Sequence, residues 1–298
     1  MSGSRVATIS VDVDPVDLHL VGYGYSGLPP DPLVYGRALP RLLEIFARCG
    51  VRATLFVVGR DARDQREALA SLSASGHEVA SHSQTHPLAF ASLAPDRMRD
   101  ELHVSRDALE QATGRPVLGY RSPNFDMNAR GLEALAECGY RYDASGYPTP
   151  LLLPARLLLA LKSRDPGAVM RLRPWPFTLR REPYRWRAGE KGLVEFPASV
   201  TALARLPIYH TLRYSLSDAR FESALEGIVR EGGSLSYALH AVDALGLSED
   251  GVDARFGRHP GMERSLETKL ALLERSLRTI TQRFESRTFG ERLRDYPD

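Results

Sequence analysis

Apolar residues recur along the chain in a repeating unit made of an amphipathic stretch, a glycine and a short apolar run. This unit appears in residues 42–59, 68–83, 132–145 and 224–241. The amphipathic stretches predict helices with one apolar face. The runs after the glycines are rich in Val, Leu, Phe, Tyr and Ala, which is typical of strands buried in a parallel sheet. The alternation therefore predicts a parallel α/β architecture.

Four glycines mark the ends of the predicted helices. Gly50, Gly76, Gly139 and Gly233 each follow an amphipathic stretch. A helix C-cap requires a left-handed backbone that glycine adopts at low cost. We therefore expect each of these glycines to end its helix.

Three more segments, residues 6–14, 117–123 and 193–200, have the composition of buried strands. With them the chain has about seven strand–helix units, which fits a distorted (β/α)7-type barrel. No Gly-x-Gly-x-x-Gly follows the first strand, which argues against a dinucleotide-binding fold. We expect residues 1–298 to form a single barrel domain, with residues 248–262 as a loop over its mouth.

Polar side chains end the predicted strands, where α/β barrels gather their chemistry. Asp12 and Asp14 end the first strand, and His82 and His86 follow a later one. Two histidines and one carboxylate are a ligand set for zinc or another divalent metal, and three protein ligands leave a position for water. Further strand ends carry Arg121, Asp143, Ser145 and His240.

Each of these groups also has a simpler interpretation. An aspartate before a proline commonly starts a turn, two loop histidines can be solvent-exposed, and Arg121 fits an ion pair equally well. Asp143 and His240 suit either a polar pair at the barrel rim or a histidine that a carboxylate prepares for proton transfer. Their convergence on one end of the barrel favours the metal site. Five histidines have no comparable neighbours and receive no role: His19, His77, His103, His210 and His259.

The motifs, in their order, resemble those of the polysaccharide deacetylase family, also called carbohydrate esterase family 4 or NodB-type deacetylases. The matching stretches are SVDVD, HSQTH, RSPNF, DASGYP and ALH, within residues 6–145 and 192–290. The His-Ser-x-x-His motif is the most specific of them. The resemblance implies a distorted (β/α) barrel that removes an N-acyl group from an amino sugar. It also implies a divalent metal, zinc in the first place, with cobalt, nickel or manganese as alternatives.

The resemblance implies roles for individual residues by position. The metal ligands would be Asp14, His82 and His86. The groups that transfer or direct protons would be the base Asp12, its partner Arg121, the acid His240 and its partner Asp143. The oxyanion and substrate would meet the backbone at Asn124 and Phe125. Val13 separates two aspartates that are commonly adjacent in the family, so the choice between Asp12 and Asp14 as base and ligand stays open.

The charge distribution sets one segment apart. The chain carries a formal net charge of +2, but residues 151–191 contain ten Lys or Arg and three acidic residues. Both tryptophans, Trp175 and Trp186, lie there, beside an almost wholly apolar run at 151–161. We expect an insert at 149–191 that faces the substrate or docks on an anionic membrane. A buried helix followed by a solvated basic loop explains the composition equally well, and no motif supports nucleic-acid binding.

These features favour a lipid- or polyprenyl-linked amino sugar as the substrate, as in lipid-directed deacetylases and deformylases of the family. A soluble chito-oligosaccharide or cell-wall polymer is the nearer alternative, and a non-catalytic sugar- or lipid-binding barrel is the alternative of another class. Cys49 and Cys138 are too few for a disulfide framework, which fits a reducing compartment. The N-terminal stretch has no uninterrupted apolar segment, so we expect a cytoplasmic protein, in peripheral contact with the inner membrane face.

Overall fold

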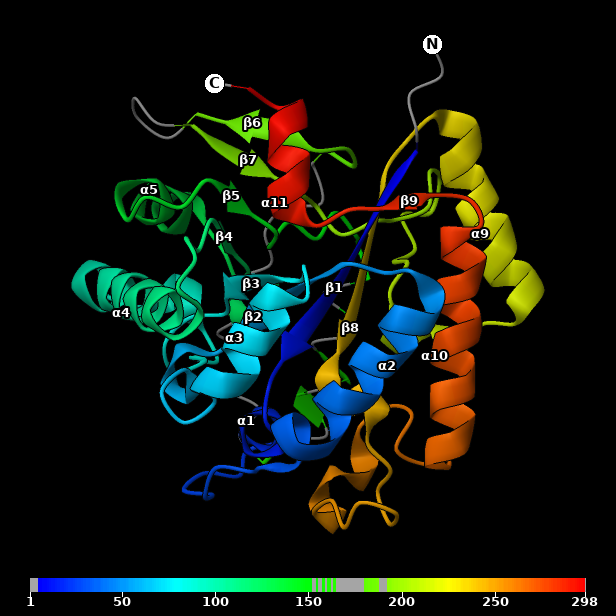
Figure 1. The fold of residues 1–298 in the computed structure, drawn as a ribbon, viewed down its shortest axis with the longest axis horizontal. Coiled ribbons are helices and arrows are strands. Elements are labelled where there is room, and N and C mark those ends of the chain that lie inside the picture. Colours follow the sequence, from blue (N-terminus) through cyan, green and yellow to red (C-terminus); the bar gives the residue numbers. More distant parts are fainter. Residues whose placement is uncertain are drawn as a thin grey trace.

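The computed structural model describes residues 5–151, 180–187 and 192–297, together with seven residues of the insert (Figure 1). Those seven residues are 154, 157, 158, 160, 161, 163 and 164. Trp175 and five of the basic residues of the insert lie outside the described residues. The prediction of one domain with an insert at 149–191 therefore stays a prediction.

Parallel strands form the centre of the molecule, and their order along the sheet is β7-β5-β4-β3-β2-β1-β8. In chain order they are β1 (Val6–Val13), β2 (Ala53–Val57), β3 (Glu78–Ser81), β4 (Gly119–Tyr120), β5 (Tyr142–Asp143), β7 (Leu193–Glu195) and β8 (Leu235–His240). Each lies within a run that the sequence pattern predicts as a strand. Two short strands were not predicted: β6 (Tyr184–Trp186), antiparallel to β7, and β9 (Glu285–Ser286), beside β1.

Helices pack around this sheet (Figure 1). The longer ones are α2 (Leu39–Cys49), α3 (Arg66–Ala74), α4 (Pro95–Thr113), α5 (Ala129–Glu137), α9 (Asp218–Glu231) and α10 (Leu266–Thr281). The short α-helices are α1 (Val16–Gly22), α8 (His210–Arg213) and α11 (Phe289–Arg292). Short turns of other helix types are η1 (Val34–Ala38), η2 (Gly59–Asp61), η3 (Phe90–Ser92), η4 (Pro123–Phe125), η5 (Ala241–Ala244), η6 (Ala254–Arg258) and η7 (Leu293–Asp295).

The sheet curls toward closure through the segment after β7. The Ser199 N–H donates to the Ser236 carbonyl at 3.2 Å, and the Ser236 N–H donates to the Ser199 hydroxyl at 2.8 Å. This segment then forms an antiparallel bridge between Val200 and Pro207. Irregular chain thus links the β7 side of the sheet to β8, and the predicted distorted (β/α)7-type barrel is confirmed.

The predicted helix ends are confirmed with one correction. Gly50, Gly76 and Gly139 have left-handed backbones, with φ of 65°, 84° and 81°. The prediction for Gly233 was wrong by one residue, because Gly232 is the C-cap of α9, with φ of 70°. Because Gly232 adopts the left-handed conformation, the N–H of Gly233 can donate to the Ile228 carbonyl at 3.1 Å.

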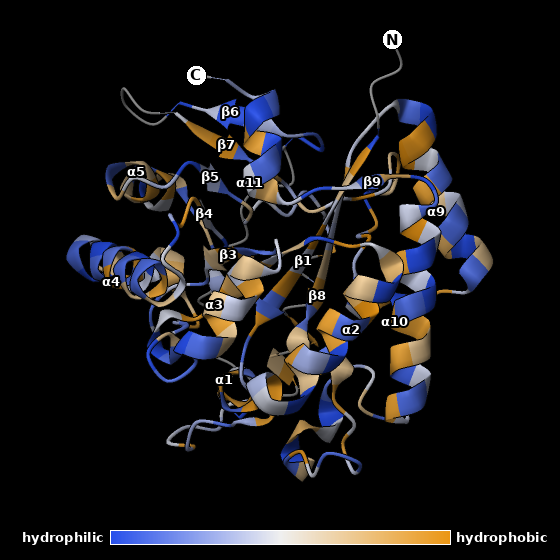
Figure 2. Cartoon of the chain, viewed as in Figure 1, coloured by the Kyte–Doolittle hydropathy of each residue, from blue (hydrophilic) through white to orange (hydrophobic). Residues whose placement is uncertain are grey.

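Figure 2 shows apolar residues on β7 and on parts of β1, whereas α4 is largely polar. β1 is buried along its whole length. α2 buries one face through Leu42, Ile45 and Phe46, as its 3.6-residue period predicts. Within the described ranges, no helix combines the length and the apolar content that crossing a membrane requires.

The described end of the insert differs from a solvated basic loop. β6 pairs with β7, and Trp186 packs against the core. Arg181 forms an ion pair with Glu231, and Arg185 donates to the Tyr296 carbonyl at 2.6 Å. These arginines lie at a sheet edge with partners of their own.

Asp250 ties α2 and η1 to the chain after β8, and we predict that Asp250→Asn lowers the free energy of unfolding by about 2 kcal/mol at pH 7. Its carboxylate accepts from Arg41 at 2.7 and 2.9 Å, from Arg37 at 3.1 Å and from the Gly246 N–H at 2.8 Å. Burial alone would raise the pKa of Asp250, but these donors lower it to about 2 from 3.8. The stabilisation is therefore complete above about pH 4 and is lost as the pH falls through about 2.

Urea unfolding at a series of pH values measures this effect. The difference between wild type and Asp250→Asn should shrink as the pH falls toward 2. Asp64→Asn is the matched control, because the Asp64 side chain is 67% exposed. Equal stability of Asp250→Asn and wild type at pH 7 would contradict the assigned role.

Candidate metal centre and active site

β1 delivers two carboxylates to the same side of the sheet. Side chains alternate between the two faces of a strand, so Asp12 and Asp14 point the same way and Val13 points into the apolar core. Asp12 stands in register with His240 at the end of β8. Both aspartates are buried, with 4% and 3% exposure. The Asp-x-Asp spacing thus places both groups at the C-terminal mouth of the barrel.

The loop after β3 is fixed by a glutamate of α4. Glu101 is buried, and it accepts two loop amide N–H groups at 2.9 and 2.8 Å and the Thr85 hydroxyl at 2.6 Å. The Ser83 hydroxyl accepts the His86 N–H at 3.1 Å. Ser83 and His86 have left-handed backbones, with φ of 65° and 57°. Such backbones are costly outside glycine and persist where surrounding contacts hold them, here to bring His86 back toward His82.

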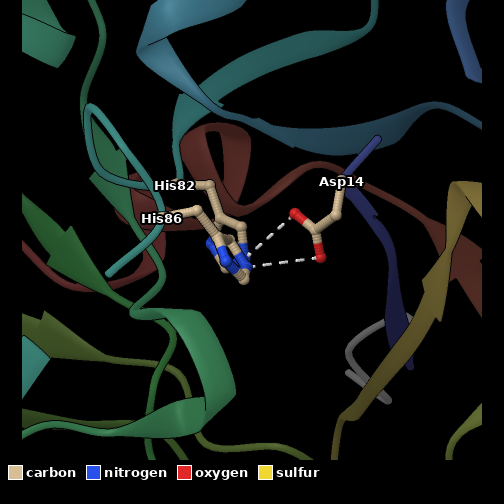
Figure 3. A group of neighbouring side chains, drawn as sticks. All are labelled: Asp14, His82 and His86. Atoms are coloured by element: carbon tan, nitrogen blue, oxygen red, sulfur yellow. Dashed lines mark ion pairs between the residues drawn. The ribbon is translucent and has the colours of Figure 1, made fainter. Parts of the chain in front are cut away.

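Asp14, His82 and His86 bring three ligand atoms together (Figure 3). His82 Nε2 lies 3.4 Å from Asp14 Oδ1, and His86 Nε2 lies 3.6 Å from Asp14 Oδ2. A tetrahedral zinc site with bonds of about 2.1 Å separates its ligand atoms by about 3.4 Å. One ligand atom from each of the three residues lies within 4.8 Å of the other two, so the group could surround one divalent ion. Within the described part of the chain, this is the one cluster of three or more His, Cys, Asp or Glu with ligand spacing.

Hydrogen bonding and burial prepare these groups for a cation. His82 Nδ1 lies 2.7 Å from the Arg121 carbonyl, which can only accept, so His82 Nε2 presents its lone pair toward Asp14. Asp14 Oδ1 is buried without a hydrogen-bond donor among the residues that the structure describes. Burial alone would raise the pKa of Asp14, but the two imidazoles hold that pKa well below its ordinary range. An ionised, buried oxygen without a donor is suited to a metal ion.

Asp12 lies beside the candidate metal ligands, and a buried arginine binds its carboxylate. Arg121 Nη1 donates to Asp12 Oδ1 at 2.6 Å, Nη2 donates to the Ser10 hydroxyl at 2.9 Å, and Nε donates to the Ala144 carbonyl at 3.1 Å. The second oxygen of Asp12 lies 4.0 Å from His240 Nε2. The structure thus brings Asp12, Arg121 and His240 together, next to Asp14.

His240 and Asp143 lie in different hydrogen-bond networks. The His240 N–H donates to Asp243 Oδ2 at 2.9 Å, and the His240 side chain is 25% exposed. Asp143 Oδ1 accepts the Ser145 hydroxyl at 2.6 Å, and its carboxyl group is paired with that of Glu195. Among the described residues no hydrogen bond or ion pair joins Asp143 to His240. The role of Asp143 as partner of the acid stays a prediction.

Asn124 and Phe125 lie in the tight turn η4, three and four residues after Arg121. Both have left-handed backbones, with φ of 56° and 54°. The Phe125 N–H donates to the Ser122 carbonyl at 3.0 Å, so this amide is used within the turn. The Phe125 ring stacks on Tyr147 with centroids 4.7 Å apart. The oxyanion role of the backbone near Asn124 stays a prediction.

His19 is a residue of the site that sequence analysis missed. Its Nε2 lies 3.9 Å from Asp14 Oδ2, and its ring centre lies 5.5 Å from His240 and 5.3 Å from His259. Burial lowers the pKa of His19 to about 4. The one signal in the sequence was Pro15, because proline is common at the start of a helix. A helix that begins there brings His19, about one turn later, back toward the end of β1. His259 extends from η6, so the 248–262 segment contributes to the surroundings of the site.

We predict that His82→Ala or His86→Ala weakens binding of Zn²⁺ by about 100-fold or more, because each removes one of three protein ligands. Competition with a chromophoric chelator, and metal content after dialysis, measure this directly. His103→Ala is the matched control, since His103 is a 67% exposed histidine of α4 that pairs with Asp107. Unchanged affinity in both ligand variants would exclude this site.

A sequence model of the polysaccharide deacetylase family matches residues 31–142, a range that includes His82, His86 and Arg121. The peptidoglycan deacetylase of Helicobacter pylori is 30% identical over 149 residues, which are 49% of this chain and 50% of that protein. The chitooligosaccharide deacetylase of Sinorhizobium fredii is 39% identical over 67 residues, which are 22% of this chain and 31% of that protein. These alignments span half or less of each relative.

A solved structure is similar over nearly the whole chain. The probable polysaccharide deacetylase from Pseudomonas aeruginosa PAO1 aligns with a TM-score of 0.60 and 18% identity, covering 98% of this chain and 91% of that chain. At this identity the likeness shows the fold, which is the barrel described above. The sequence match over residues 31–142 and the shared barrel fold agree, and this part of the chain is similar to the polysaccharide deacetylase family.

Proposed function

We propose that this protein is a metal-dependent hydrolase that removes an N-acyl group, acetyl or formyl, from an amino sugar. One observation carries the proposal: a metal-ligand cluster with the spacing of a zinc site lies directly beside a buried Asp12–Arg121 pair and His240. Hydrolysis of an amide requires an activated water, a base and an acid. The mouth of this barrel offers groups suited to each.

The geometry supports one division of labour between the two aspartates. Asp14 lies 3.4–3.9 Å from the Nε2 atoms of three histidines, His82, His86 and His19, which suits a metal ligand. Asp12 is instead held at one oxygen by Arg121, with its other oxygen toward His240. We therefore assign Asp14 to the metal and Asp12 to the base.

When bound, a divalent ion, zinc in our proposal, would lower the pKa of a water molecule and polarise the acyl carbonyl. Asp12 Oδ2 accepts the proton of the attacking water, because Oδ1 already accepts from Arg121. The Arg121 hydrogen bond fixes the orientation of that carboxylate. His240, whose side chain is 25% exposed against 2% for His82 and 11% for His86, donates a proton to the departing amine through Nε2.

A non-catalytic sugar- or lipid-binding barrel is the competing class. Such a protein would need the ligands for a metal, but it would gain nothing from Asp12, Arg121 and His240 in their observed arrangement. Burying an arginine and an aspartate costs free energy that a pair only partly recovers. Their presence beside the metal cluster supports the enzyme.

The apolar part of the insert supports a lipid-linked substrate. Leu157, Leu158 and Leu161 are 52%, 59% and 76% exposed. The segment returns to the barrel at Arg164, whose N–H donates to the Tyr23 carbonyl at 3.1 Å. The Tyr23 hydroxyl in turn lies 3.4 Å from His259 Nδ1, next to the site. Exposed leucines near the mouth suit an enzyme that takes its amino sugar from a membrane.

The relatives named above suggest the alternative substrates, a chito-oligosaccharide or peptidoglycan. Mass spectrometry after incubation with metal-loaded protein distinguishes these from glycolipids, because the loss of an acetyl or formyl mass identifies both the substrate and the bond. We expect release from a lipid-linked N-acyl amino sugar.

We predict that Asp12→Asn lowers kcat by about 10²–10⁴-fold, because the amide cannot accept the proton of the attacking water. Zn²⁺ affinity should stay within a few-fold of wild type, since Asp12 is no ligand in our assignment. Circular dichroism and thermal unfolding must accompany the assay, because the variant leaves Arg121 buried without its counter-ion. A folded, metal-bound Asp12→Asn protein with wild-type turnover would refute the role of Asp12 as the base. If Asp12→Asn instead loses the metal, the assignment is reversed, with Asp12 as the ligand and Asp14 as the base.

We also predict that replacing Leu157, Leu158 and Leu161 together with Ser lowers binding to anionic vesicles by at least about tenfold, since less apolar surface enters the interface. Co-sedimentation with phosphatidylglycerol vesicles measures the change. Val104→Ser is the control, because Val104 is a 48% exposed apolar residue of α4. Leucines test this surface more cleanly than Arg181 or Arg185, which have structural partners. Unchanged sedimentation would remove the membrane contact.

A further inference from the structure

Two buried carboxyl groups meet at the ends of neighbouring strands. Asp143 ends β5 and Glu195 ends β7, and the two residues are register partners in the sheet. They are 0% and 3% exposed. Their side chains are hydrogen-bonded to each other. Ionised carboxylates only accept hydrogen bonds, so this pair must hold a proton.

Among the residues that the structure describes, no cation forms an ion pair with Asp143 or Glu195. The Arg121 guanidinium, which acts on Glu195 only through its charge, donates its hydrogen bonds to Asp12, the Ser10 hydroxyl and the Ala144 carbonyl. Two negative charges in a buried place without a counter-ion are far more costly than one carboxylate and one acid. Burial raises the pKa of Glu195 well above its usual range, and it raises the pKa of Asp143 to about 6. Glu195 therefore holds the proton at pH 7.

The acceptor for that proton can be identified. Asp143 Oδ1 accepts the Ser145 hydroxyl at 2.6 Å. Asp143 Oδ2 is buried, and no N–H or hydroxyl group of the residues that the structure describes donates to it. Glu195 Oε1 accepts the Gly146 N–H at 2.8 Å. These contacts leave Oε2 of Glu195 and Oδ2 of Asp143 as the oxygens that the shared hydrogen would join.

This acid–carboxylate pair is connected to the active site through the loop after β5. The Ser145 hydroxyl oxygen accepts the N–H of Ser122 at 2.8 Å, which is the residue directly after Arg121. Ala144, between Asp143 and Ser145, supplies the carbonyl that holds Arg121 Nε at 3.1 Å. A Cβ at Gly146 would lie 2.6 Å from Glu195 Oε1, so the close approach of this loop to the acid requires glycine. The pair thus fixes the backbone that holds Arg121 from two sides.

We propose that Glu195 is a positioning residue that acts as a neutral carboxylic acid: it donates its hydrogen to Asp143 and thereby holds the 144–146 loop against Arg121, the partner of Asp12. This role goes beyond the residues assigned above, and its catalytic consequence rests on the proposed function. It also assigns Asp143 to the residues that position Arg121.

The first experiment needs neither substrate nor metal. Infrared spectroscopy at pH 7 should show a carboxylic acid C=O band in wild-type protein that is absent in Glu195→Gln. Glu44→Gln is the matched control, because Glu44 is an exposed glutamate of α2, and it should leave the band unchanged. The proposal is overturned if the infrared difference spectrum at pH 7, wild type minus Glu195→Gln, shows a carboxylate band in place of the carboxylic acid band.

The second experiment measures the effect on turnover. The amide of Glu195→Gln can donate to Asp143 and accept from Gly146, so its kcat should stay within about threefold of wild type, whereas Glu195→Ala should lose about tenfold or more in kcat with little change in KM. Zn²⁺ affinity should be unchanged in both variants. A Glu195→Gln protein as slow as Glu195→Ala, or a fully active Glu195→Ala, contradicts the positioning role. If wild-type protein turns over no amino sugar, the proposed function fails, and the infrared result still decides the state of Glu195.

Discussion

Arg121 is the residue on which the arrangement of the site depends, because it holds a candidate base and a candidate metal ligand at the same time. Its guanidinium binds Asp12, and its backbone carbonyl accepts the Nδ1 hydrogen of His82. The guanidinium carbon lies 4.1 Å from the ring centre of Phe56, and the residue is 2% exposed. A buried arginine needs a partner charge, and Asp12 supplies it. Strands β1, β3 and β4 therefore keep one relative position, which holds the candidate base Asp12 beside the candidate metal ligands.

The sequence pattern was sufficient for the parts of the fold that depend on local periodicity. Strands β1, β2 and β8 are long apolar runs, and the left-handed glycines at 50, 76 and 139 separate helices from strands at predictable places. Strands β4 and β5 contain two residues each, yet they were found. β5 follows a predicted helix and Gly139, and β4 lies in a run with the composition of a buried strand. The same reasoning placed Asp14, His82 and His86 together, since the ends of parallel strands share one edge of the sheet.

Residues that act across long sequence distances could not be found in this way. β6 lies within a strongly basic segment, and only pairing with β7 makes it a strand. Glu101 looks like any solvated glutamate of a polar helix, although it accepts three hydrogen bonds from the loop that carries His86. His19 has no histidine near it in sequence, and its neighbours come from β8 and η6. Glu195 is one acid in a strand of three residues, and its partner lies 52 positions earlier.

The balance of charge at the mouth explains why these separate groups form one site. Asp12 is matched by Arg121, and the pair of Asp143 and Glu195 keeps a proton in place of a cation. Asp14 is the remaining buried acid of the mouth, beside three imidazoles. Burial lowers the pKa of His82 and of His19, whereas the Asp14 carboxylate raises the pKa of His86 although burial opposes it. A divalent cation placed there would be attracted by the negative charge of Asp14 and by nitrogen lone pairs, and it would displace any proton that His86 holds. Because Arg121 and the protonated Glu195 already satisfy the other acids, our assignment directs the cation to Asp14 and leaves Asp12 to accept a proton from water.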